Sequence, residues 1–265
     1  MKKIQKLPRR RYDWKPDLPD HRDYLFALTA PAPTKLPSRV DLRASCSPVM
    51  NQGQIGSCTG NSLAGALEFL EIRELRDGSG AEVFDPNQFD PISRLFIYYS
   101  ERSLEGTTAQ DGGGMLRDGV KALTQWGSCR ERTWKYTKTN VLKKPTGSAY
   151  KEAGNHLIST YLRILSLTEM KQCLASGFPF VFGFSVYESF ESPSVAKSGI
   201  APMPLQNESL VGGHAVMAAG YDDAKKMLLV RNSWGPDWGQ DGYFWLPYAY
   251  VSSPRLAQDF WTIRK

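Results

Sequence analysis

The stretch NQGQIGSCTGNSLAGALEFLEIREL, residues 51–75, joins a glycine-rich loop to a long apolar pattern. DGSG, residues 77–80, follows and stops that pattern. The spacing predicts a long, largely buried helix that begins at Cys58 and ends near Arg76. Its leucines recur at helical intervals, at Leu63, Leu67, Leu70 and Leu75.

Cys58 stands at the first turn of this helix. The unpaired amides and the positive end of a helix favour an anion there, which predicts a lowered thiol pKa and a larger thiolate fraction. The other three cysteines, Cys46, Cys129 and Cys173, lack this setting and are interpreted as free buried thiols, with a disulfide of Cys46 left open. No spacing is typical of zinc or of a thioredoxin motif, so we expect no metal site.

The predicted secondary structure changes from helical to extended near the middle of the chain. Two more helices are expected at 91–104 and 115–126, before a linker-like stretch at 136–147. The pattern then turns extended, interrupted by one short helix at 168–177. A helical first half and a strand-rich second half predict an α+β protein of two unlike lobes with a ligand site between them. The expected strands lie at 157–165, 180–187, 215–221, 227–232, 242–246 and 259–263.

Composition excludes several classes of protein. The chain has 265 residues, of which 41% are hydrophobic and 12% aromatic, a composition that does not match collagen, coiled coil or general disorder. Its 33 Lys and Arg against 27 Asp and Glu give +6, a mild imbalance that favours solubility over nucleic-acid binding. No apolar run approaches the roughly 20 residues of a membrane span, and no secretory signal peptide is legible. We expect no membrane contact and a cytoplasmic location by default, with non-classical secretion left open.

Three histidines limit the choice of a catalytic imidazole. His21 lies between charged residues near the amino terminus, and His156 lies near a strand start; both are interpreted as ordinary surface or packing residues. His214 differs because it follows two glycines and precedes a small apolar strand. That pattern places an imidazole at the buried end of a strand, where glycine lets a ligand backbone approach closely.

Asn232 is positioned to support His214. Eighteen residues separate the two, enough for two strands and a turn that return the chain beside its starting point. The Asn232 amide can then hold the imidazole by accepting its ring N–H. Trp234 can shield that hydrogen bond from water, which would weaken it.

Three ordered blocks, NQGQIGSC at 51–58, GHAV at 213–216 and NSWG at 232–235, together resemble the papain family of cysteine peptidases. PDLPDHRDYLF at 16–26 and GGGMLRDGVKALTQWGSC at 112–129 are similar to its bacterial, xylellain-like branch. The resemblance covers nearly the whole chain. It implies a papain-like two-lobe fold, with a helical lobe, an antiparallel β-barrel-like lobe and an active-site cleft between them.

The resemblance also implies a role for each matching residue. Cys58 would be the nucleophile, His214 the base and later the acid, and Asn232 the residue that orients the imidazole. The Gln52 amide would join the Cys58 backbone N–H in an oxyanion hole. The expected reaction is endopeptidase hydrolysis of a peptide or protein through a thioester acyl-enzyme, with no metal or organic cofactor.

Further positions would contact the substrate. Gly113 and Gly114 match the family's paired glycines, which bind an extended substrate backbone by main-chain hydrogen bonds. Trp234 is placed beside the substrate as well. An uncharged pocket predicts a preference for an apolar side chain second from the cleaved bond, on its amino side. The residues implied to line that pocket are Met115, Leu116, Gly183, Gly213 and Ala215.

The chain departs from the family pattern at two places near the nucleophile. Thr59 replaces the usual aromatic residue directly after it, which leaves the packing behind Cys58 less defined. Ile55 replaces the usual cysteine three residues before it, so the family's common disulfide cannot form there. Reducing surroundings are therefore compatible with the chain.

We divide the chain into an extended, basic and proline-rich arm at 1–37, a mainly helical lobe at 38–140 and a β-rich lobe at 141–265. The arm is too short for the helical propeptide that the resemblance would imply. One hypothesis is that it crosses the domain and partly covers the cleft in cis. The alternative is a strap that only ties down the terminus.

Two other functions are compatible with the same residues. A Cys/His/Asn site can also run transamidation or hydrolysis of non-peptide amides. The chain can also be a non-catalytic binding protein on a peptidase scaffold that uses its basic tail to hold an anionic partner. The presence of Cys58, His214, Asn232 and Gln52 together favours the peptidase.

Overall fold

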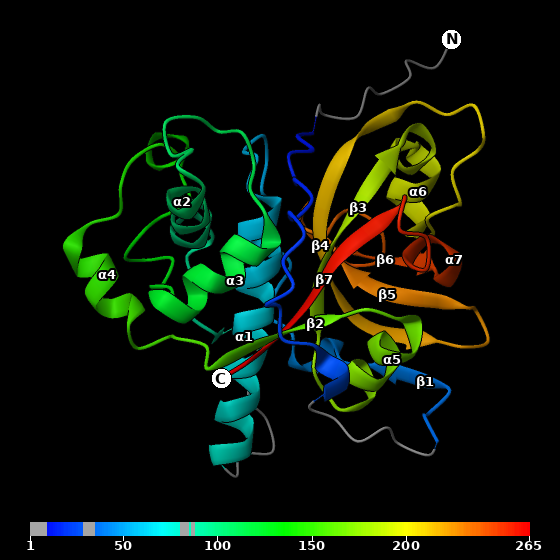
Figure 1. Cartoon of the computed structure of the whole chain (residues 1–265), viewed down its shortest axis with the longest axis horizontal. Helices are drawn as coiled ribbons and strands as arrows, with labels where there is room; N and C mark the ends of the chain where they lie inside the picture. The colour runs from blue at the N-terminus through cyan, green and yellow to red at the C-terminus, as the bar shows by residue number, and fades with distance from the viewer. Residues whose placement is uncertain (1–9, 29–34, 80–84, 86–87) are drawn as a thin grey trace.

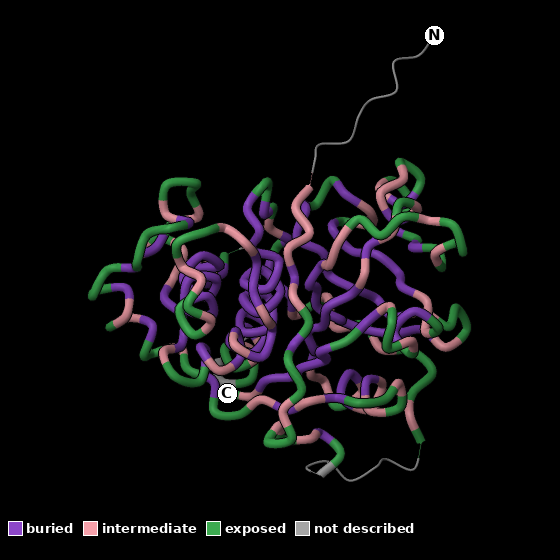
Figure 2. Tube along the Cα trace, turned by 45° about the horizontal axis from the view of Figure 1, so that its top comes forward, coloured by how far each residue is buried: buried purple, intermediate pink, exposed green. Residues whose placement is uncertain are grey.

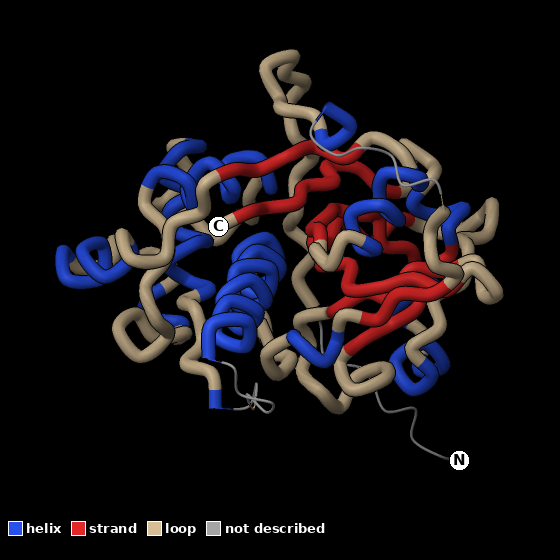
Figure 3. The backbone as a smooth tube through the Cα atoms, turned by 90° about the horizontal axis from the view of Figure 1, so that it is seen from below, coloured by secondary structure: helices blue, strands red, loops and turns tan. Residues whose placement is uncertain are grey.

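A computed structural model describes residues 10–28, 35–79, 85 and 88–265. Figure 1 shows the long helix α1 and several further helices in one half of the molecule, and a twisted sheet with short helices on it in the other. Seen from below in Figure 3, the strands form one curved sheet, with the long helix on one side of it and short helices packed around it. The predicted α+β architecture with a helical and a β-rich lobe is confirmed.

The helical lobe is built around α1 (Cys58–Ser79), which begins at the predicted residue. It also contains α2 (Arg94–Glu105), α3 (Leu116–Gln125) and α4 (Gly147–Ala153). Ser93 caps α2 by accepting from the Phe96 N–H, and Gly106 ends it in the left-handed conformation. Leucines on α1 pack against the sheet, with Leu63 and Leu67 in one core with Met217. Residues 58–72 of α1 are buried on nearly all sides, so its polar side chains there need partners: Thr59 donates to Glu101, and Glu68 accepts from Ser47.

The β-rich lobe is one antiparallel sheet in the order β2-β7-β3-β4-β5-β6, with the short β1 also paired to β4. Within the described residues β2 and β6 lie at opposite ends of this order and do not pair, so the expected barrel-like lobe is an open sheet rather than a closed barrel. The strands are β1 (Arg39–Asp41), β2 (Thr160–Ile164), β3 (Phe180–Tyr187), β4 (Leu210–Asp222), β5 (Met227–Arg231), β6 (Tyr243–Pro247) and β7 (Ala257–Arg264).

Short helices decorate the sheet. The expected helix after β2 is α5 (Leu167–Ala175), capped by Ser166. Sequence reasoning did not predict α4, α6 (Pro193–Ser198) or α7 (Tyr248–Val251). The signals for α6 were present, because Ser192 caps it, proline occupies its first position and Gly199 ends it. Single-turn 3-10 helices lie at Phe26–Leu28, Arg43–Ser45, Lys138–Asn140 and Glu188–Glu191.

The chain crosses between the lobes more than once. β1, from the 38–140 segment, pairs with β4 in the sheet. Conversely, α4, from the 141–265 segment, packs in the helical lobe, where the rings of Tyr150 and Phe96 lie 4.9 Å apart. α4 buries Ala149 and Ala153 in the helical lobe, whereas β1 stays largely exposed and packs only Val40 against the core of the sheet.

The amino-terminal arm lies between the two lobes. In Figure 1 its dark-blue trace runs between the helices and the sheet, and in Figure 2 it crosses the line where the two buried interiors meet. Trp14 and Phe26 of the arm are both buried. None of the helices in the described ranges is long and apolar enough to cross a bilayer.

Candidate active site

The fold attaches the loop before α1 to the β-rich lobe. The Gln52 N–H donates to the Ser233 carbonyl at 2.8 Å, and Asn51 forms a β-bridge with Trp234. Cys58, at the start of α1, is fully buried. The backbone N–H of Ala215 counteracts the rise in the pKa of the Cys58 thiol, and Ala215 lies in the same buried cluster as Cys58. Cys58 therefore lies close to the residue that directly follows His214 in β4.

His214 and Asn232 meet through the pairing of β4 with β5. The ring Nε2 of His214 lies 2.9 Å from Oδ1 of Asn232, so the imidazole donates from this nitrogen. Its Nδ1 has no hydrogen-bond partner and remains available to accept a proton. The Trp234 ring stacks on the imidazole with centroids 4.9 Å apart and planes 18° apart. That stacking shields the His214–Asn232 bond from water.

Gln52 lies on the same side of the site. Its Oε1 accepts from the Ser233 hydroxyl at 2.5 Å, and its Nε2 donates to the Ile55 carbonyl at 3.0 Å. A side-chain amide carries two N–H donors, so one remains for another acceptor. Ser233, which sequence reasoning missed, thus fixes the orientation of Gln52. Its position directly after Asn232 is the signal that could have identified it.

The predicted substrate-binding glycines surround the arm. The Trp14 N–H donates to the Gly213 carbonyl at 3.0 Å, and the Lys15 N–H donates to the Gly114 carbonyl at 3.1 Å. A Cβ on Gly113 would lie 1.6 Å from the Asp13 carbonyl oxygen. The arm backbone therefore occupies the position that the sequence analysis assigned to an extended substrate.

The Trp14 side chain fills the predicted pocket. A Cβ on Gly183 would lie 1.9 Å from its Cε2 atom, so only glycine admits the indole there. Leu116 and Ala215 are buried in the same apolar cluster as Trp14. Met115, the remaining predicted lining residue, is half-buried and lies directly before the first residue of α3.

Charged residues of the arm lie on both sides of Cys58 and His214. The Arg10 guanidinium lies 3.9 Å from the centre of the Trp234 ring, which in turn stacks on His214. Asp13 approaches Gly56, where a Cβ would lie 2.4 Å from its Oδ2. Arg10 forms an ion pair with Glu191 at 3.4 Å. The arm thus places a positive charge near the imidazole and a negative charge near the thiol.

The electrostatics of this covered site favour the neutral forms of both groups. Burial raises the pKa of Cys58 to about 12, and the nearby carboxyl groups of Glu101 and Asp13 add to the rise. Burial, helped by Arg10, lowers the pKa of His214 to about 4 despite the hydrogen bond to Asn232. The helix terminus predicts a lowered thiol pKa, and with the arm in place that prediction is wrong because desolvation outweighs the helix dipole.

A buried polar cluster anchors the arm farther along. The Asp17 N–H donates to Asp259 at 2.7 Å, and Asp17 Oδ2 accepts from the Trp261 indole at 2.8 Å. Asp23 pairs with Arg117 at 2.6 Å and with Arg163 at 2.7 Å. These contacts join the arm to α3, β2 and β7.

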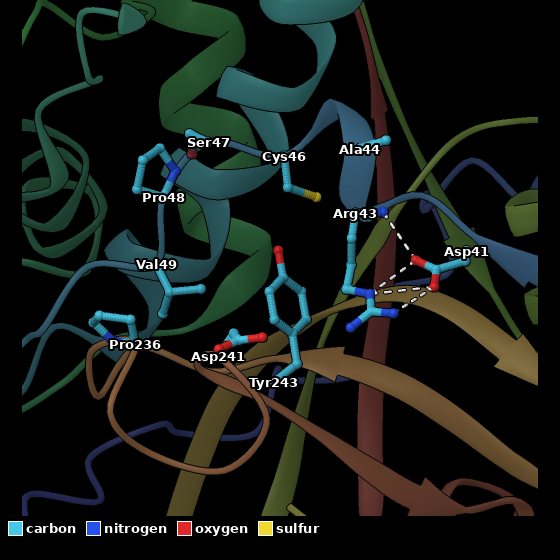
Figure 4. Close-up of a pocket in the computed structure, with 10 residues that line it drawn as sticks. All are labelled: Asp41, Arg43, Ala44, Cys46, Ser47, Pro48, Val49, Pro236, Asp241 and Tyr243. Carbon is cyan, nitrogen blue, oxygen red and sulfur yellow. Dashed lines mark hydrogen bonds and ion pairs between the residues drawn. The ribbon is translucent and has the colours of Figure 1, made fainter. Parts of the chain in front are cut away.

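An open cavity of about 660 Å³ lies outside this site (Figure 4). Arg43 donates to Asp41 at its rim, and the Tyr243 hydroxyl points toward Cys46 and Ser47. None of the catalytic candidates lines it.

The cysteines Cys46, Cys58, Cys129 and Cys173 are all free, so the disulfide left open for Cys46 is not formed. The described part of the chain holds no group of His, Cys, Asp and Glu suited to a metal.

The chain is similar to several known proteins. Residues 97–258 match the family described as papain family cysteine protease. An uncharacterized peptidase C1-like protein of Acanthamoeba polyphaga mimivirus is 40% identical over 93% of this chain and 84% of its own length. The crystal structure of xylellain, a cysteine protease from Xylella fastidiosa, is 40% identical, covers 98% of this chain and 99% of its own, and has a TM-score of 0.83. Human cathepsin L2 is 26% identical over 78% of this chain and 60% of its own length.

Proposed function

This chain belongs to the papain family of cysteine proteases, and we propose on that basis that Cys58, His214, Asn232 and Gln52 make it an endopeptidase. One observation carries the assignment of the residues. The imidazole is held by Asn232 beneath Trp234 with Nδ1 unpartnered, and the next residue in the chain lies in the same buried cluster as Cys58. An acceptor nitrogen and a thiol are thereby brought to one place at the start of a helix.

The proposed reaction proceeds in two halves. The thiol gives its proton to Nδ1 of His214, and the sulfur attacks the peptide carbonyl carbon. The oxyanion accepts from the Gln52 amide and the Cys58 backbone N–H. His214 then protonates the leaving amine, which departs and leaves a thioester on Cys58. A water molecule, deprotonated by His214, attacks the thioester and releases the acid together with the thiol.

We further propose that the arm inhibits this reaction in cis. Its backbone bonds to Gly213 and Gly114, and Trp14 fills the space next to Gly183, so a peptide cannot bind while the arm is docked. The charges of Arg10 and Asp13 add to this effect, because they disfavour the imidazolium and the thiolate respectively. The same contacts support the proposal that the pocket accepts a large apolar side chain.

The central experiment incubates the wild-type chain and a Trp14→Ala variant with a denatured protein and identifies the fragments by mass. We expect cleavage sites with apolar residues second from the cut on its amino side, and no cleavage after the thiol has been alkylated. Addition of a primary amine separates hydrolysis from transamidation, because acyl transfer would give fragments that carry the amine. Absence of fragments from both chains would refute the endopeptidase assignment.

Gln52→Ala is expected to lower kcat/KM about 10²- to 10³-fold, since one oxyanion donor is lost. Ser233→Ala is the matched control, because it removes only the hydroxyl that bonds to Gln52 Oε1 and leaves the amide donor in place. We expect the control to lose less than about tenfold, the cost of one orienting hydrogen bond. Equal losses in steady-state peptide hydrolysis would show that Gln52 acts only through the packing of its loop.

Gly183→Ala is expected to reduce the preference for an aromatic second residue about 10-fold or more. The added Cβ enters the volume that the Trp14 indole now fills. The measurement is the ratio of kcat/KM for two peptides that carry Phe or Ala at that position, so a general effect on arm docking cancels. Ser185→Ala, on the same strand, is the control, and an unchanged ratio in Gly183→Ala would exclude this residue from the pocket.

A further inference from the structure

Asp111 joins two parts of the site that are far apart in the chain. Its Oδ1 accepts the backbone N–H of Gly56 at 3.1 Å, two residues before Cys58. The same oxygen accepts the Tyr98 hydroxyl at 2.6 Å. That hydroxyl in turn accepts the backbone N–H of Gly113 at 3.0 Å. A continuous hydrogen-bonded chain therefore runs from the nucleophile loop to the substrate-binding glycines.

Packing contacts and hydrogen bonds around Tyr98 hold this hydrogen-bonded link in place. Tyr98, on α2, is fully buried. A Cβ added to Gly60 of α1 would lie 3.0 Å from the Tyr98 Cβ, so α1 and α2 are in close contact there. Arg102 packs on the Tyr98 ring at 3.9 Å and donates to the Gln110 carbonyl at 2.7 Å. These contacts hold the loop that carries Asp111 against α2. Burial and the bond to Asp111 raise the pKa of Tyr98, so its hydroxyl stays protonated and donates.

No covalent bond reinforces the nucleophile loop. Ile55 stands at the position where the family commonly has a half-cystine, and the cysteines of the chain are free. Gly56 therefore depends on hydrogen bonds for its placement relative to the substrate-binding glycines. A hydrogen bond from a backbone N–H to a carboxylate is charge-assisted, so it is stronger than a hydrogen bond between two neutral groups.

We propose that Asp111 is a positioning residue of the proposed peptidase: it holds the nucleophile loop and the substrate-binding glycines at a fixed separation, with Tyr98 as the link to Gly113. The inference rests on the proposed function. Asp111 also binds the arm, because Arg11 donates to its Oδ2 at 2.6 Å and to its backbone carbonyl. A test must therefore separate positioning from arm anchoring.

The Arg11→Gln variant provides that separation. It removes the ion pair between Arg11 and Asp111 and leaves the hydrogen bonds of Asp111 to Gly56 and Tyr98 in place. Arg11→Gln alone is expected to hydrolyse a peptide faster than wild type. Asp111→Ala added to it is expected to lower kcat/KM about 10- to 100-fold below Arg11→Gln, because small misplacements of reacting groups cost that much. The rate of thiol alkylation by iodoacetamide, which needs no bound peptide, should stay within about 3-fold.

A conservative replacement checks the cause. Asp111→Asn keeps an acceptor for the Gly56 N–H and should retain at least about a third of the Arg11→Gln activity, while Tyr98→Phe, which unlinks Gly113, should mainly raise KM. These two variants carry the test if Asp111→Ala does not fold. The proposal is overturned if Asp111→Ala leaves peptide hydrolysis at the Arg11→Gln level, if hydrolysis and alkylation fall together, or if Asp111→Asn is as poor as Asp111→Ala. An inactive Arg11→Gln chain, in contrast, would count against the endopeptidase assignment itself.

Discussion

Cys58→Ala is expected to reduce hydrolysis of a denatured protein by about 10⁴-fold or more, because loss of the nucleophile removes the acyl-enzyme route altogether. Only the weak catalysis of the oxyanion donors and substrate binding would remain. The fold should survive, since the sulfur is replaced by a hydrogen in a small buried site. The measurement is fragment yield over time, determined by mass, on chains of matched concentration.

Cys46→Ala is the control for this prediction. Cys46 is also free and buried, but it lines the cavity of Figure 4, away from His214. Burial raises the pKa of its thiol, so it is protonated and unreactive near neutrality. We expect Cys46→Ala to cut the denatured protein at the wild-type rate. Activity of Cys58→Ala within tenfold of Cys46→Ala would remove Cys58 from the mechanism.

Trp14→Ala is expected to speed alkylation of Cys58 by iodoacetamide on the order of 100-fold or more near neutral pH. With the arm docked, the pKa of the thiol lies at about 12, so only a minute thiolate fraction exists. Trp14 is 7% exposed, and truncation of a buried Trp typically costs about 3–5 kcal/mol. Losing that contact releases the arm, hydrates the thiol and removes Asp13, each of which lowers the pKa.

The pH profile gives the sign of this effect. A thiol whose pKa is raised in the docked state stabilises docking while it is protonated, and that contribution is lost as the pH rises toward about 12. Wild type should therefore react slowly up to strongly alkaline pH, and Trp14→Ala should reach its plateau at a lower pH. Leu18→Ala is the control, because Leu18 lies on the same arm with a side chain 71% exposed. Identical profiles for all three chains would show that the arm does not control the thiol.

Much of the site could be predicted from local sequence. A cysteine at a helix start after a glycine-rich loop depends only on residues 51–75. His214 lies on β4 and Asn232 directly follows the neighbouring antiparallel strand β5, so the spacing of 18 residues brings them together, although the register of the pair shifts between Ala218 and Gly220. The elements that carried the longest periodic patterns, α1 and β3 among them, also lie where the patterns indicated.

Other contacts were decided by the tertiary structure alone, because no local sequence pattern predicts them. The placement of Trp14 against Gly183, and of Asp111 against Gly56, depends on how the two lobes close around the arm, and no periodicity in the sequence encodes the distance between segments so far apart. The protonation state of the pair belongs here as well. A helix terminus lowers a thiol pKa through nearby amides, whereas the desolvation that reverses this at Cys58 arises from everything packed around it. The sequence thus determined the longer helices and strands and the identity of the catalytic candidates, because these depend on residues close in the chain. The docking of the arm in the cleft and the protonation of Cys58 and His214 were decided by the tertiary structure, because they depend on long-range packing.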